Sequence, residues 1–103
     1  MHNLDFKFTD IEEKIIDSLM IEKHYSAEEA EFFIKITRLV TFLLMQENYD
    51  IIYLSSVYAD MCFELVDKVK TYYKAYVNCK PFDIQFKLGD EIKQYSVDNT
   101  YLN

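Results

Sequence analysis

The chain has 103 residues, of which 50% are hydrophobic and 17% aromatic, and its formal net charge is −7. This length predicts a single domain spanning residues 1–103, and the apolar content excludes an intrinsically disordered chain. The acidic charge disfavours non-specific binding to nucleic acid or to an anionic membrane. No long apolar run and no basic, apolar leader occurs in the sequence, so we expect a cytoplasmic protein without membrane association.

The N-terminal region predicts a strand followed by a helix. Residues 3–8 alternate polar and apolar side chains, which is typical of a short strand with one buried face. Thr9 and Glu12 then have the spacing of a capping box, in which each side chain accepts a hydrogen bond from the backbone of the other residue. We therefore expect a helix over residues 10–23.

A second helix is expected over residues 27–47, because Ser26 and Glu29 form another capping box. Its apolar residues cover more than one helical face, which is typical of a helix buried on several sides. We interpret it as the central helix of the domain. In the alternative, surplus apolar residues of this helix form a homodimer or heteromeric interface; the candidates are Phe32, Phe33, Phe42 and Leu43.

A third helix is expected over residues 51–78, with Asp50 as its N-cap and Pro81 beyond its end. Apolar residues recur along it at spacings of three and four positions. The sequence therefore predicts one long helix here.

The region that follows, residues 82–97, predicts a β-hairpin. Two alternating segments flank Gly89, the only glycine in the chain. Glycine at the first turn position is typical of a type II′ turn, and this turn would set Ile84 opposite Tyr95. A short helical turn over residues 89–96 is the alternative.

Because a lone hairpin is only marginally stable, we expect the strand at residues 3–8 to join it. The predicted fold is α+β and helix-dominated, with three helices packed on a small antiparallel sheet in the order β-α-α-α-β-β. The alternative is an all-α bundle with an irregular C-terminal tail. In either case residues 97–103 are expected to fray.

No motif for nucleophilic catalysis, phosphate binding or metal coordination occurs in the sequence. The two histidines, His2 and His24, fall at the terminus and in a predicted loop. Asp60, Glu64 and Asp67 share one face of the third predicted helix, but without histidine or cysteine beside them they fit a solvated surface better than a metal site. We therefore expect no enzyme activity, no cofactor and no metal.

Acidic residues crowd the starts of the first two predicted helices. Capping and solvation account for many such residues, but a negative patch can also dock on a basic surface of another protein. We therefore predict a protein-binding factor, most specifically an inhibitor, antitoxin or immunity-type protein that docks on a basic surface of a partner protein, of which a nucleic-acid-binding surface is one example. The lysine-rich, arginine-poor composition fits AT-rich coding DNA and hence a mobile element. The predicted partner-binding residues are Glu12, Glu13, Asp17, Glu28, Glu29 and Glu31.

Two other functions stay open. Lysines and tyrosines interleave near the end of the third predicted helix, as in surfaces that hold phosphates and stack bases; this nucleic-acid alternative would use Lys68, Lys70, Tyr73 and Lys74. A self-assembling structural subunit would instead use residues 27–47. The open edges of the predicted sheet form a further docking surface, since a partner strand can extend them.

Overall fold

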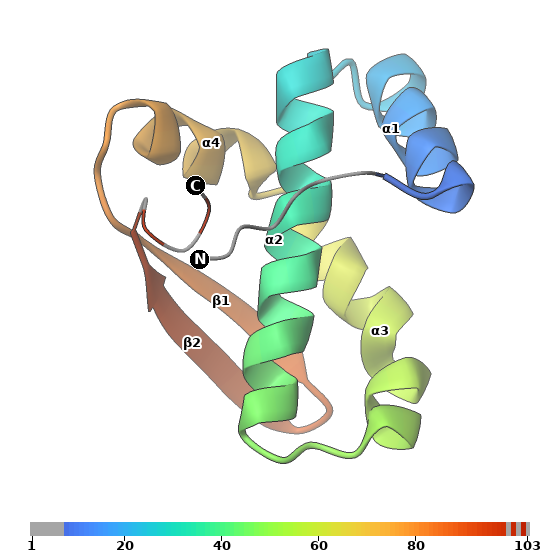
Figure 1. The fold of residues 1–103 in the computed structure, drawn as a ribbon, viewed down its shortest axis with the longest axis vertical. Coiled ribbons are helices and arrows are strands. Elements are labelled where there is room, and N and C mark those ends of the chain that lie inside the picture. Colours follow the sequence, from blue (N-terminus) through green and yellow to red (C-terminus); the bar gives the residue numbers. More distant parts are fainter. Residues whose placement is uncertain (1–7, 99, 101, 103) are drawn as a thin grey trace.

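The computed structural model describes residues 8–98, 100 and 102. Within these residues, four helices and one two-stranded antiparallel sheet form the helix-dominated α+β fold that the sequence predicts. Figure 1 shows the longest helix, α2, in the centre, with α1 and α3 along one side and α4 and the hairpin along the other. In chain order the elements are α1 (Asp10–Glu22), α2 (Ala27–Gln46), α3 (Ile51–Val66), α4 (Val69–Val77), β1 (Phe82–Leu88) and β2 (Glu91–Val97).

Both predicted capping boxes are present at the helix starts. The Thr9 hydroxyl accepts a hydrogen bond from the Glu12 backbone N–H at 3.1 Å, and the Glu12 carboxylate accepts one from the Thr9 backbone N–H at 2.9 Å. Ser26 and Glu29 repeat this arrangement at the start of α2. These local signals confirm the predicted starts of α1 and α2.

The single helix predicted over residues 51–78 is wrong, because it divides into α3, which ends at Val66, and α4, which begins at Val69. Tyr25, in the loop before α2, donates its hydroxyl proton to the Val66 backbone carbonyl at the dividing point. In an uninterrupted helix this carbonyl would accept the N–H of Lys70. A tertiary contact therefore replaces a helical hydrogen bond, and α4 packs on α2 and β1 as a separate element.

The hairpin has the predicted register, with Ile84 opposite Tyr95. Gly89 has a φ of +61°, as the first central position of a type II′ turn requires. A Cβ atom added there would lie 2.6 Å from the Tyr53 hydroxyl oxygen, so the Tyr53 side chain would have to shift to admit it. The alternative of a helical turn over residues 89–96 is wrong.

The third strand, predicted over residues 3–8, lies outside the described residues except for Phe8, which belongs to no strand. Phe8 packs on the core, and the guanidinium carbon of Arg38 lies 5.4 Å from the centroid of its ring. At the other end of the chain, Val97 and Leu102 are buried core residues within the segment that we expected to fray.

The core forms where α2 meets the other elements, and nine α2 residues are buried. Phe32 and Phe33 are 2% and 5% exposed, so they belong to the core and are not available for a dimer interface. The burial of nine α2 residues confirms the interpretation of α2 as the central helix. Phe42, by contrast, is 56% exposed, so an interface through this residue stays a prediction. None of the described helices is long and apolar enough to cross a lipid bilayer.

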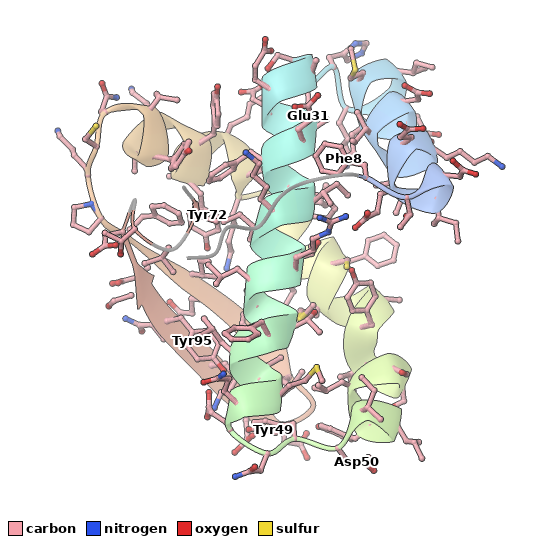
Figure 2. All side chains as sticks on the ribbon, in the orientation of Figure 1. Phe8, Glu31, Tyr49, Asp50, Tyr72 and Tyr95 are labelled. Atoms are coloured by element: carbon pink, nitrogen blue, oxygen red, sulfur yellow. The ribbon has the colours of Figure 1, made fainter. Side chains whose placement is uncertain are left out.

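Polar contacts tie the hairpin to the C-terminal end of α2. Glu47 accepts hydrogen bonds from the Lys93 ammonium at 2.7 Å and from the Tyr95 hydroxyl. The Tyr49 hydroxyl donates to the Glu91 carboxylate at 2.5 Å. Figure 2 shows Tyr95 and Tyr49 near this end of α2. These bonds fix β2, while α3 and α4 contact β1.

Candidate partner-binding site

A depression of about 150 Å³ opens where the N-terminal half of α2 meets α4. Aromatic packing builds part of its wall, because the Phe32 ring centroid lies 5.3 Å from that of Tyr73 and 5.0 Å from that of Tyr76. We call it the acidic-aromatic pocket, and its lining residues are Glu28, Glu31, Phe32, Lys35, Tyr73 and Tyr76.

Helical spacing explains how these side chains come together. Glu28, Glu31 and Lys35 are three and four positions apart, so they share one face of α2. Tyr73 and Tyr76 are likewise three positions apart on α4. Figure 2 shows Glu31 on the upper half of α2, the half that α4 flanks. The contact between the two helices then places carboxylates next to phenol rings.

The carboxylates set the electrostatic character of the pocket. Burial raises the pKa of the Tyr73 hydroxyl above its ordinary value, and the negative charges of Glu28, Glu29 and Glu31 raise it further. Among the described residues, Glu28 and Glu31 form no ion pair and no side-chain hydrogen bond. Lys35 lines the same pocket and offsets one of the two charges, so the lining keeps a net charge of −1 (two carboxylates and one ammonium), which still favours a cation.

Two of the six predicted acidic residues have structural partners. The Glu12 carboxylate accepts two hydrogen bonds from the Arg38 guanidinium, one of them from Nε at 2.8 Å. Hydrogen bonding from Arg38 is the main cause that holds the pKa of Glu12 below its ordinary value. The Glu29 carboxylate is bound in the capping box with Ser26. These two residues serve the fold.

The other four predicted acidic residues fall into two pairs. Glu13 and Asp17 are exposed on α1, whereas Glu28 and Glu31 line the pocket between α2 and α4. Figure 1 shows α1 and α4 on different sides of α2. The structure therefore gathers only Glu28 and Glu31 into a pocket.

The residues of the predicted nucleic-acid surface also have different surroundings; these are Lys68, Lys70, Tyr73 and Lys74. The Lys68 ammonium donates to the Gln85 backbone carbonyl at 2.7 Å, and the Lys70 ammonium lies 5.4 Å from the centroid of the Tyr25 ring. Tyr73 lies among carboxylates in the acidic-aromatic pocket. Because those carboxylates repel phosphate, Tyr73 is poorly placed to stack a base on a bound strand.

The outer edge of β1 is already occupied. The Gln85 N–H donates to the Tyr72 hydroxyl at 3.3 Å, and the Lys87 N–H donates to the Glu64 carboxylate at 2.8 Å. The Lys68 ammonium donates to the Gln85 backbone carbonyl on the same edge. Side chains of α3 and α4 thus use the backbone groups that a partner strand would need. The prediction of an open edge for strand addition is wrong for β1.

Comparison of the chain with protein-family models, curated proteins and solved structures gives no significant match. Within the described part of the chain, no three His, Cys, Asp or Glu side chains are arranged to hold a metal ion. Both cysteines are free thiols, Cys62 half-buried and Cys79 exposed.

Sequence reasoning identified parts of the pocket but not the whole. It assigned Glu28 and Glu31 to an acidic face and Tyr73 to a nucleic-acid face, and it assigned Lys35 and Tyr76 to neither site. The local signal was the shared face of Glu28, Glu31 and Lys35 on the second predicted helix. The contact with α4 depends on the break before Val69, which no local pattern indicates.

Proposed function

We propose that the protein binds another protein, and that the acidic-aromatic pocket receives a cationic side chain from the partner's basic surface. The observation that carries this proposal is the placement of the Glu28 and Glu31 carboxylates beside the Tyr73 ring. An arginine or lysine side chain in the pocket meets a negative charge and an aromatic face together, so ion pairing adds to cation–π attraction.

Such a protein acts by covering the surface to which it binds. When the covered surface is one that handles nucleic acid, the bound protein competes with the phosphate backbone, which is the action of an inhibitor, antitoxin or immunity-type protein. The net charge of −7 supports this role. A negative molecule is steered toward basic partners, which raises its association rate and selects among partners.

Fluorescence anisotropy with a labelled nona-arginine peptide tests the pocket. We expect the double variant Glu28→Gln/Glu31→Gln to weaken binding by about tenfold or more. The matched control, Glu13→Gln/Asp17→Gln, also removes two negative charges, but from α1. It should weaken binding less than about threefold. Equal losses in both variants would mean general charge attraction and would contradict the pocket.

The nucleic-acid alternative makes a different prediction. It requires retention of the wild-type chain on immobilised single-stranded DNA at about 0.15 M salt, and loss of retention when Lys68, Lys70 and Lys74 are changed to Glu. We expect no retention of either protein. A wild-type chain that is retained and a variant that is not would replace our proposal with this alternative.

A further inference from the structure

Helix α3 carries an apolar face that no other described element covers. Ile52 is 76% exposed and Phe63 is 75% exposed. Ser56 and Ala59, which lie between them, are exposed as well. Spacings of four, three and four positions place these four residues on one line along the helix, as in a coiled-coil seam. We call this line the outer stripe of α3.

The outer stripe lies opposite the side of α3 that packs on the core. At 3.6 residues per turn, Met61 is rotated about 180° from Ile52. Met61 and Leu54, on the inner side, are 2% and 5% exposed. Figure 1 shows α3 at the periphery of the molecule, on the opposite side of α2 from α4 and β2. A helix with apolar residues on opposite sides is normally covered on both sides.

Burying the outer stripe would leave few polar groups unsatisfied. The Ser55 hydroxyl donates to the Ile51 backbone carbonyl at 2.9 Å, and the Ser56 hydroxyl donates to the Tyr53 carbonyl at 2.7 Å. Both donors are therefore already paired within the helix. A hydroxyl that keeps its hydrogen bond costs little to remove from water.

The charge distribution leaves α3 as a face on which a second copy of the chain can dock. α3 contains only two charged residues, Asp60 and Glu64. Glu64 is directed to β1, where it binds the Lys87 N–H, and Asp60 lies about 80° around the helix from Ile52. Two molecules of net charge −7 repel each other over much of their surfaces. The outer stripe is a face on which they can meet with little repulsion.

We propose that two copies of the protein pair through the outer stripes of their α3 helices, antiparallel about a two-fold axis. The order large, small, small, large reads the same in both directions. An antiparallel pair therefore sets Ile52 of one protomer beside Phe63 of its partner, and Ser56 near Ala59. The small central residues let the backbones approach, and the large residues fill the ends of the seam.

The expected affinity follows from the size of the face. An aromatic side chain such as Phe63 buries roughly 150–250 Å² when it is enclosed. Ile52 and Phe63 therefore supply most of the apolar area of the outer stripe. Stable interfaces bury about 800 Å² on each partner, so a seam of one short helix suits a dissociation constant on the order of micromolar.

Sedimentation equilibrium of the full chain tests the pairing. We expect the average mass to rise with concentration toward twice the 12.4 kDa of one chain. Ile52→Lys or Phe63→Asp should weaken the dimer by about tenfold or more without unfolding the protomer, because both side chains are exposed. The matched control is Ile92→Lys, which changes a residue of β2 that is 69% exposed. A monomeric wild type, or equal weakening by Ile92→Lys, would overturn the proposal.

Disulfide cross-linking tests the antiparallel orientation. In chains carrying Cys62→Ala and Cys79→Ser, one preparation receives Ser56→Cys and another, of different mass through a tag, receives Ala59→Cys. Mixed under oxidation, the two should cross-link to each other faster than either cross-links to itself. Dominant self-cross-linking would indicate parallel helices, and the absence of cross-linking would exclude close approach. Either result would overturn the proposed seam.

Discussion

Helices α2 and α3 are both apolar on more than one side, but the described residues cover α2 on most of its sides and α3 mainly on one. α1, α3 and α4 all pack on α2, so nine of its 20 residues are buried. The main partners of α3 are α2 and β1, and Ile52 and Phe63 stay about three-quarters exposed. The amount of apolar surface on a helix thus indicates how much of that helix must pack against other elements. The order and direction of the neighbouring elements decide whether the chain supplies that cover.

Two phenylalanines give the sharpest test of this contrast. Phe32→Ala, in α2, should destabilise the fold by about 3–5 kcal/mol, because it leaves a cavity in the core. Phe63→Ala, on the outer stripe of α3, should change the stability of the monomer by no more than about 0.5 kcal/mol. Urea denaturation at low protein concentration, where the protomers are separate, measures both. A large loss for Phe63→Ala would show that the monomer itself covers this face.

The contact that ends α3 provides the next test. Tyr25→Phe removes the hydroxyl that satisfies the Val66 carbonyl, a buried contact. Leaving a buried carbonyl unpaired should cost about 1–3 kcal/mol in urea denaturation. Tyr49→Phe is the matched control, because it removes an exposed hydrogen bond to Glu91, and its effect should be much smaller. Equal effects would mean that the Tyr25 hydroxyl does not hold the break between α3 and α4.

The hairpin turn tests how closely β1 and β2 approach α3. Gly89→Ala places a side chain at a φ of +61° and 2.6 Å from the Tyr53 hydroxyl oxygen. The backbone strain alone should cost about 1–3 kcal/mol. In a Tyr53→Phe background the loss should be smaller, because the oxygen that the new Cβ meets is gone. A double-mutant cycle in urea measures the difference, and the same loss in both backgrounds would contradict the close contact.

Local signals predicted much of this fold. The capping boxes at Thr9 and Ser26 marked two helix starts, because the paired residues lie within one turn of each other. The alternating pattern around Gly89 gave the hairpin and its register for a similar reason. Each of these features depends on residues that are neighbours in sequence, so each can be predicted from the local sequence alone.

The features that sequence reasoning missed depend on contacts between distant residues. Tyr25 donates to the Val66 carbonyl, 41 positions away, at the point where the long predicted helix divides. Glu64 and Lys68 have the spacing of a helical ion pair, but they bind the backbone of β1 instead. The acidic-aromatic pocket likewise joins residues of α2 and α4. These residues are separated in the sequence by the rest of α2 and by all of α3. Such contacts leave no periodic pattern in the sequence. For this reason the sequence predicted a single acidic face, whereas the acidic residues lie in different places in the structure.

The smallest expected effect concerns the ion pair by which α1 helps to cover α2. Glu12→Gln keeps a side chain that can complete the capping box but removes the charge that binds Arg38. At pH 7 the variant should be less stable by about 1 kcal/mol, the upper range for a pair near the surface. Glu13→Gln is the matched control, since it removes an exposed neighbouring charge and should change little.

The pH dependence of that loss separates the ion pair from general charge effects. Arg38 holds the pKa of Glu12 below its ordinary value of 4.5, so the folded state releases the proton more readily than the unfolded state. The stabilisation by the charged pair is therefore complete above this ordinary pKa and disappears as the pH falls through the lower pKa of the folded state. Urea denaturation of both proteins at a series of pH values from 7 downward should show their stabilities converging in the acidic range. A difference that stays constant with pH would mean that the Glu12 charge does not help to fasten α1 to α2.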